Sequence, residues 1–305
     1  MRNGGYIFHD RVPGQSGGRT VLDFYACTHV RATRDEWVRR IAAGLVSREG
    51  RVLTAGDLVA EGDHLQYSRP PWDEPDVPLD APVLYEDPDC LIFHKPAGLP
   101  VLPGAGCQDN TLLALAQRRF GPDVRPVHRL DTGTSGAVAF ARSTESARHL
   151  CQAFATRRVE KTYLARVVGS DLPERFSVAQ PIGRVLYPPL GFVSGVAPDG
   201  KTASSHIEVL ARDPGRNQAI VQVRIDTGRN QQIRIHLAWA GFPLAGDPLY
   251  GPGGHPRLPA PGEPPAKPGD GGFLLHAWKL VLPRRDGERW TTVAPPPDGL
   301  VAQKG

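Results

Sequence analysis

The chain has 305 residues, of which 40% are hydrophobic and 22% charged, as in an ordinary folded protein of about two domains. No segment approaches the roughly 20 apolar residues of a membrane helix, and the first residues lack the apolar part of a signal peptide. The four cysteines form no C-x-x-C pair, which argues against a zinc site and a disulfide framework: Cys27, Cys90, Cys107 and Cys151. We therefore expect a reduced, cytoplasmic protein without a metal.

The charge is mildly basic, with a formal net value of +4 and a pI near 9.0, and arginine outnumbers lysine. Arginine binds phosphate with two parallel hydrogen bonds and stacks on bases, so this balance is compatible with RNA binding. A GC-rich genome enriches arginine, glycine, proline and alanine whatever the function. Composition alone leaves both explanations open.

The first 70 residues predict a small domain behind an extended arm. Residues 1 to about 20 are polar and rich in glycine. Thr33-Arg34-Asp35-Glu36 then has the spacing of a capping box, and apolar residues follow at helical intervals: Trp37, Val38, Ile41 and Leu45. Short segments up to about residue 70, separated by glycine-containing turns, are typical of strands.

The order of small and apolar residues in this region resembles an S4-like RNA-binding module: Ile41-x-x-Gly44-x-Val46, Gly56-Asp57-x-Val59 and Gly62-Asp63. The resemblance implies that nearby arginines meet phosphates, namely Arg34, Arg39, Arg40, Arg48 and Arg51. A solvated helix face offset by neighbouring acids is the alternative. We expect the arm and module to span residues 1–75, a proline-rich linker to span 76–82, and a second domain to span 83–305.

The second domain begins with a predicted strand that runs from Cys90 to Lys95 and ends in a Pro/Gly turn. Thr111 to Arg119 predicts a helix that Gly121-Pro122 terminates. A second helix is predicted after Ser143, with an apolar stripe made of Ala147, Leu150, Cys151 and Phe154. Cys151 is therefore expected to be a buried thiol.

Between these helices lies the run Val127 to Gly136, in which Asp131 follows two basic residues and precedes small, turn-permissive ones. Arg125 to Leu130 and Ala137 to Ala141 predict strands on its two sides. The small residues leave the loop open, so a large partner could approach Asp131. A hairpin in which Asp and Thr cap their own turn is the structural alternative.

Further strands are predicted over residues 161–167, 204–211 and 218–227, with a helix after Asn230 as its N-cap. Ile233, His236, Leu237 and Ala240 share one face of that helix, which places Arg234 off the core side. Residues 243–251 predict a surface turn, and residues 251–272, dense in glycine and proline, a flexible loop. A last strand is expected over residues 273–280.

The run His128-Arg129-Leu130-Asp131-x-x-Thr134-Ser135-Gly136 resembles the active-site signature of the RluA-type pseudouridine synthases, which isomerise selected uridines of RNA. Other segments match in the family's order: Lys95-Pro96-x-Gly98, Lys161-x-Tyr163-x-Ala165, Gly228-Arg229 with Ile233-Arg234, and Leu275-His276-Ala277. The likeness covers roughly residues 83–297. Asn230-Gln231 stands where the family pattern has Thr-His, so the role of that histidine is in doubt.

The resemblance implies an α+β catalytic domain on a largely antiparallel sheet, with an RNA cleft across it and an S4-like module as a separate lobe. It implies that Asp131 is the catalytic carboxylate, Arg234 its ionic partner and Tyr163 a platform for the target uracil. The implied RNA- or uridine-binding residues are Arg129, His128, Leu275, Lys95 and Arg229. A purely structural role for Lys95, and core positions for Tyr163 and Leu275, are the alternatives. No metal and no cofactor are expected.

We expect site-selective isomerisation of uridine in structured RNA by base flipping, with ribosomal RNA favoured over transfer RNA, by a monomer that needs no nucleotide cofactor. A non-catalytic RNA-binding protein on the same fold is the alternative, although Asp131, Tyr163 and Arg234 are all present. A glycosidase-like hydrolase would commonly need a second carboxylate about 5–10 Å from the first. No second acid stands out beside these motifs.

Overall fold

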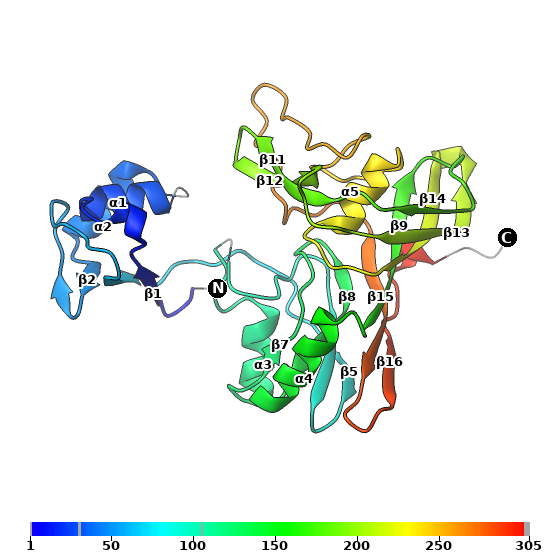
Figure 1. Ribbon diagram of the computed structural model, residues 1–305, viewed down its shortest axis with the longest axis horizontal. Helices are drawn as coiled ribbons and strands as arrows, with labels where there is room; N and C mark the ends of the chain where they lie inside the picture. Colours follow the sequence, from blue (N-terminus) through cyan, green and yellow to red (C-terminus); the bar gives the residue numbers. More distant parts are fainter. Residues whose placement is uncertain (1, 30–31, 105, 302–305) are drawn as a thin grey trace. The chain divides into compact units, whose positions relative to one another are not determined.

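The computed structural model describes residues 2–29, 32–104 and 106–301, and the chain divides into two compact units, residues 1–75 and 76–305 (Figure 1). In the first unit, a sheet with strand order β1-β4-β2-β3 accompanies two helices. The strands are β1 (Tyr6–Arg11), β2 (Val46–Arg48), β3 (Arg51–Val52) and β4 (His64–Arg69), and the helices are α1 (Val21–Thr28) and α2 (Arg34–Ala42).

Helix α2 begins at the predicted capping box. Thr33 Oγ1 accepts from the Glu36 N–H at 3.2 Å, and the Glu36 carboxylate accepts from the Thr33 N–H at 2.7 Å. The predicted extended arm is wrong, because β1 pairs antiparallel with β4 along its whole length. The β1 side chains are exposed or half-buried, so the strand lacks the strong apolar alternation that would have identified it.

The second unit is built on a 10-stranded sheet with the main order β10-β13-β14-β9-β15-β8-β6-β5, to which β16 and β7 add at β15 and β8. The strands are β5 (Val83–Glu86), β6 (Cys90–Lys95), β7 (Arg125–Pro126), β8 (Ser135–Ala141), β9 (Glu160–Val168), β10 (Arg175–Val178), β13 (Ser205–Asp213), β14 (Gln218–Ile225), β15 (Leu275–Pro283) and β16 (Arg289–Val293). Strands β8 and β15 run parallel, and the other pairings between these strands are antiparallel. The expected α+β class with a largely antiparallel sheet is confirmed.

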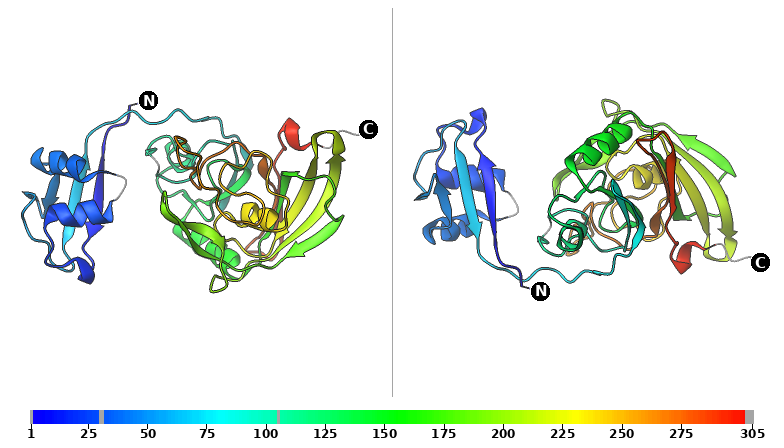
Figure 2. Two further views of the ribbon diagram at one scale, coloured as in Figure 1. Left: turned by 90° about the horizontal axis from the view of Figure 1, so that it is seen from above. Right: turned by 90° about the horizontal axis from the view of Figure 1, so that it is seen from below.

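Three helices pack on this sheet: α3 (Leu112–Phe120), α4 (Thr144–Ala155) and α5 (Gln232–Trp239). The predicted starts of α3 and α4 are confirmed, since Thr111 and Ser143 accept backbone N–H groups of the first turn. In Figure 2 the green and yellow strands curve around the yellow helix α5, and Ile233 and Leu237 of this helix belong to the main apolar core of the sheet.

A two-stranded hairpin, β11 (Ile182–Tyr187) and β12 (Gly191–Val196), lies outside the main sheet and was not predicted. Tyr187 and Val193 from the hairpin share an apolar cluster with Ile235 and Ala238 of α5. This cluster anchors the hairpin to the helix.

Two expectations about the second unit need correction. Cys151 is exposed, whereas Leu150 is buried, because Cys151 lies at the edge of the apolar stripe of α4. The segment 76–82, expected as a linker, packs on the second unit: Val77 and Ala81 contact its main core, and Pro82 O accepts from the His94 N–H at 2.8 Å. In the part of the chain that the structure describes, no helix combines the length and apolarity needed to cross a membrane.

Candidate active site

Asp131 lies in the loop that enters β8. Leu130 before it is buried in the main core, and the Thr134 N–H donates to Asp131 O at 3.0 Å, which closes the turn. Gly136, at the start of β8, has φ +113°, and a Cβ there would lie 2.3 Å from Ala277 O. Only glycine fits this close approach of β15. The small residues of the signature therefore let β15 run beside β8 and fix the loop that carries Asp131.

The half-buried carboxylate of Asp131 accepts hydrogen bonds from the Gln231 amide. Gln231 Nε2 lies 3.1 Å from Asp131 Oδ1 and 3.3 Å from Oδ2. Gln231 precedes α5 in the left-handed conformation, with φ +53°, and its side chain does not cap the helix. The predicted N-cap, Asn230, is therefore wrong by one residue, because the N-cap position falls on Gln231, whose amide is used to bind Asp131.

Several groups act on the charge of Asp131. Burial raises the pKa of its carboxyl group, and the Arg234 charge, the Gln231 hydrogen bond and the charges of Arg129 and Lys95 oppose this effect. Burial has the larger effect, so the pKa of Asp131 is raised overall, and the surrounding cations and the amide only partly restore the anion. Such a group is suited to nucleophilic attack or proton removal.

Arg234 does not occupy the position that the helical pattern predicted. Its side chain is 1% exposed, and its ion pair is with Asp247: Nε lies 2.7 Å from Asp247 Oδ2, and Nη2 lies 2.8 Å from Oδ1. The expected direct pairing with Asp131 is corrected accordingly. A buried guanidinium needs a bidentate carboxylate, and Asp247 supplies it. Arg234 acts on Asp131 through its charge.

Asp247 lies in the segment predicted as a surface turn, and this prediction is also wrong. Asp247, Leu249 and Tyr250 are buried. Asp247 Oδ1 accepts from the N–H groups of Leu249 and Tyr250 at 2.8 Å and 3.0 Å, in addition to its bond with Arg234. The turn is folded inward because it carries the counterion of Arg234.

Lys95 is fully buried at the end of β6, which contradicts the implied contact with an RNA phosphate and agrees with the alternative of a structural role. Its Nζ donates to the carbonyl oxygens of Pro96 at 2.9 Å, Leu99 at 2.7 Å and Thr132 at 3.1 Å. These bonds use all three protons of an ammonium group. Burial lowers the pKa of Lys95 to about 7, and the Asp131 charge partly opposes this. Through Thr132, Lys95 holds the loop of the candidate carboxylate.

His128 is half-buried and makes two structural contacts, and its expected contact with RNA stays a prediction. Its Nε2 accepts from the Ala139 N–H at 2.9 Å, and its ring stacks on Phe154 with centroids 4.7 Å apart. Burial, helped by the Lys161 charge, lowers the pKa of His128 to about 3. The imidazole is therefore neutral near pH 7 and ties the signature to β8 and α4.

Tyr163, Leu275 and Leu130 all belong to the main apolar core of the second unit, and Leu130 directly precedes Asp131. Tyr163, on β9, is paired with Val223 on β14 and Ala277 on β15, and it is 8% exposed. Burial raises the pKa of Tyr163, and the negative charge of Asp131 raises it further. Tyr163 is thus a neutral aromatic residue in the electrostatic range of the carboxylate.

A cleft of about 370 Å³ opens beside Gln231. Its walls come from the signature, the hairpin, the start of α5 and the glycine- and proline-rich segment 251–272: Arg129, Arg184, Phe192, Val193, Ser194, Asn230, Gln231 and Pro268. Arg129 is exposed in this cleft, as expected for a residue that binds RNA. Arg229 is half-buried, and its Nε donates to Thr202 O at 3.0 Å, so part of its hydrogen-bonding capacity is structural.

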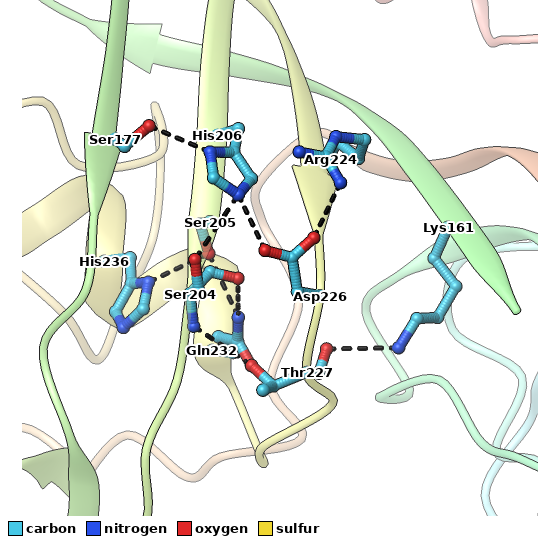
Figure 3. A network of polar contacts seen from close by, with 10 residues as sticks. All are labelled: Lys161, Ser177, Ser204, Ser205, His206, Arg224, Asp226, Thr227, Gln232 and His236. Carbon is cyan, nitrogen blue, oxygen red and sulfur yellow. Dashed lines mark hydrogen bonds and ion pairs between the residues drawn. The ribbon is translucent and has the colours of Figure 1, made fainter. Parts of the chain in front are cut away.

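A polar network fixes the beginning of α5 (Figure 3). Gln232 Oε1 accepts from Thr227 Oγ1 at 2.7 Å, and Gln232 Nε2 donates to Ser204 O at 2.9 Å and to Ser205 Oγ at 3.1 Å. His236 Nδ1 lies 2.9 Å from the same Ser205 hydroxyl. Because Gln232 directly follows Gln231, this network determines where the amide that binds Asp131 is placed.

The glycine- and proline-rich segment 251–272 was expected as a flexible loop, yet its end packs on the signature loop. A Cβ on Gly133 would lie 2.9 Å from Gly271 Cα and 3.3 Å from Asp270 O. Pro268 O accepts from Arg234 Nη1 at 2.6 Å. The segment therefore forms one wall of the site.

Sequence reasoning missed Gln231, Gln232 and Asp247. All three lie within segments that resemble the family, but spacing could not show which of their atoms meet. Across the described residues, no group of three or more His, Cys, Asp or Glu side chains is placed to hold a metal ion. A carboxylate held among cations, beside an open cleft with arginine in its walls, is an arrangement suited to chemistry on a phosphate-rich polymer.

Comparison with known proteins identifies the family to which this chain is similar. The family model described as RNA pseudouridylate synthase matches residues 89–239. An uncharacterised RNA pseudouridine synthase of Synechocystis is 40% identical over 261 residues, which are 85% of this chain and 88% of that protein. The ribosomal large subunit pseudouridine synthase D of Pseudomonas aeruginosa is 34% identical, over 81% of this chain and 78% of that protein.

Among solved structures, the human protein named RNA pseudouridylate synthase domain-containing 1 superposes with a TM-score of 0.59 at 25% sequence identity. The match covers 75% of this chain and 89% of that chain. The chain belongs to the RNA pseudouridine synthases, which are isomerases, and the RluA-type resemblance is confirmed.

Proposed function

We propose that this synthase isomerises a selected uridine in a structured RNA, with ribosomal RNA favoured over transfer RNA, and that Asp131 is its catalytic carboxylate. The observation that carries the proposal is the hydrogen bonding of Asp131 by Gln231, a residue that lines the arginine-containing cleft. The Pseudomonas relative, a ribosomal large subunit pseudouridine synthase, supports the ribosomal preference.

The reaction needs no oxidant or reductant. The bond from ribose C1′ to uracil N1 breaks, the base turns, and C1′ joins C5, while the proton lost from C5 is balanced by one gained at N1. The Asp131 anion either attacks the ribose or removes a ribose proton, and both routes need the ionised carboxylate. Arg234, Arg129 and the Gln231 amide favour that form, against the effect of burial.

A uridine inside folded RNA reaches the carboxylate only after it leaves the base stack. We assign Tyr163 as the face on which the uracil stacks, with Leu275 beside it in the apolar cluster. Arg129 would occupy or brace the vacated position. Tyr163→Phe should keep more activity than Tyr163→Leu, because stacking contributes about 1–3 kcal/mol per base. Equal rates for the two folded variants would contradict this assignment.

For the first unit we propose a role in RNA affinity. Arg39 on α2 is exposed, whereas Arg34, Arg48 and Arg51 are ion-paired with Asp23, Asp63 and Asp57. Deletion of residues 1–75 should raise KM and flatten the salt dependence of binding, with less effect on kcat. An equally active truncation with the same salt slope would show that the unit has no such role.

The test of the activity uses purified protein incubated with ribosomal RNA and, separately, with transfer RNA. Pseudouridines are then mapped and compared with those in cellular RNA made with and without the gene. We expect one or a few sites to appear in ribosomal RNA. Modification of transfer RNA alone would overturn the substrate preference, and the absence of any new pseudouridine would overturn the proposal.

A further inference from the structure

The hairpin β11–β12 has two different faces. Val185, Tyr187 and Val193 belong to the cluster that packs on α5. The alternate positions face outward, and two large apolar residues there are strongly exposed: Leu186 at 68% and Phe192 at 54%. Leu186 and Phe192 are directly opposite each other in the hairpin. Exposed aromatic and aliphatic side chains grouped on one face commonly mark a binding surface.

Arg184 completes this outer face. Its guanidinium lies 4.4 Å from the centre of the Phe192 ring, in a cation–π contact. Arg184 and Phe192 both line the cleft, together with Arg129 and Gln231. Gln231 in turn is hydrogen-bonded to Asp131. The outer face of the hairpin is therefore continuous with the candidate active site.

We propose that the Arg184–Phe192 pair is a stacking platform for an unpaired base of the RNA that lies next to the target uridine. Aromatic rings and guanidinium planes both stack on nucleobases, and the arginine also meets phosphate. The proposal rests on the proposed function for the identity of the RNA. It adds a contact outside the position of the reacting base.

The chemistry of the cleft favours RNA over an acidic or apolar protein segment as the occupant. Among the residues that the structure describes, its lining combines two arginines, two amide side chains and one exposed aromatic ring, and it includes no carboxylate. Arginine side chains bind phosphates and an aromatic ring stacks on bases, so together they suit RNA, in which flat bases alternate with phosphates. Base stacking is tolerant of sequence, so this platform would add affinity and would leave the choice of uridine to other contacts.

The test measures the affinity of the full chain for a fluorescently labelled, single-stranded oligouridylate by anisotropy. Phe192→Leu should weaken binding by roughly 5- to 150-fold, the range expected for losing one stacked base. Phe192→Trp should bind at least as tightly as the wild type. Arg184→Gln should weaken binding and lower the salt dependence by about one phosphate contact.

Trp239→Leu is the matched control, since Trp239 is also exposed, at 42%, but does not line the cleft. It should leave the affinity unchanged. The inference is overturned if Phe192→Leu binds like the wild type, if leucine and tryptophan at 192 are equivalent, or if the wild type does not bind the oligouridylate. Because binding is measured without turnover, a wild type that binds RNA but forms no pseudouridine refutes the proposed function alone.

Discussion

Two regions place a buried cation near the Asp131 carboxylate, and they bind that cation in different ways. At the end of β6, Lys95 is surrounded by three backbone carbonyls and has no carboxylate among its hydrogen-bond partners. At α5, Arg234 is held by both oxygens of Asp247. Burial lowers the pKa of Lys95 to about 7, whereas an arginine remains charged at any physiological pH.

The α5 region and the β6 region therefore have different roles at the site. The α5 region keeps a permanent positive charge near Asp131 and adds the neutral donor Gln231. The β6 region fixes the loop through the Lys95 bond to Thr132, and its charge declines as pH rises above about 7. We infer that ionisation of Asp131 at neutral and alkaline pH depends chiefly on the α5 region, and that Lys95 chiefly holds the loop.

The largest expected effect comes from breaking the ion pair of the α5 region. Asp247→Ala leaves the Arg234 guanidinium buried without its carboxylate, which should cost about 3–5 kcal/mol of unfolding free energy. Denaturant titration measures this loss. Glu174→Ala breaks the exposed Arg212–Glu174 pair and is the control, with an expected cost of about 0–1 kcal/mol. Similar losses in the two variants would contradict the special position of Arg234.

A smaller effect is expected when the neutral donor is removed. Gln231→Leu deletes the hydrogen bond to Asp131 and should lower kcat by roughly 10- to 100-fold, because a bond to a charged group contributes about 1.5–3 kcal/mol. KM should change little. Gln152→Leu, at an exposed position of α4, is the matched control and should retain the wild-type rate.

Gln231→His extends this test. A neutral imidazole also donates a hydrogen bond, so this variant should be faster than Gln231→Leu at alkaline pH and should acquire a new titration between about pH 5 and 8. Charged groups near this position are Asp131, Arg129, Arg234 and Lys95. Equal rates for the leucine and histidine variants would show that the hydrogen bond to Asp131 does not matter.

The smallest effect concerns the pH dependence of stability in the β6 region. The folded pKa of Lys95, about 7, lies below the ordinary lysine pKa of 10.5, so the folded state binds fewer protons between these values. Stability should therefore rise with pH in this window, by about 1 kcal/mol per unit from this residue. Lys161, whose pKa burial lowers to about 8, adds a rise at higher pH.

Lys95→Met should remove the Lys95 part of this rise and leave that of Lys161. The measurement is denaturant unfolding of both proteins at several values between pH 7 and 9. Parallel stability curves for the wild type and Lys95→Met would mean that Lys95 keeps its proton throughout. The contrast between the two buried cations would then disappear.

Local sequence signals predicted much of the fold. Side chains that bond to nearby backbone, such as Thr33, Thr111 and Ser143, marked helix starts correctly because their partners lie within one turn. The core strands β6, β9 and β14 were visible as apolar segments. Strand β1 and the hairpin β11–β12 were missed, since their outward positions are exposed and their apolar pattern is weak.

Sequence motifs identified the main residues of the candidate site, but they predicted few of the contacts between those residues. Asp131 and Tyr163 came from motifs, and the structure brings them close enough for the Asp131 charge to act on Tyr163. Helical periodicity placed Arg234 away from the core, because it cannot foresee a buried counterion 13 positions later. Likewise, nothing in the local pattern around Lys95 indicates the three backbone carbonyls that bind it. Long-range partners of buried charges are the part that one sequence does not reveal.

The most direct test of the account is the activity of Asp131→Asn on RNA whose uridines carry tritium at C5, since each isomerisation releases that label. Asparagine keeps the size of the side chain and removes its charge. We expect tritium release at the background rate, with wild-type stability and RNA affinity. Substantial release by Asp131→Asn, in protein shown by mass spectrometry not to have deamidated to Asp, would contradict the assignment of Asp131 as the catalytic carboxylate.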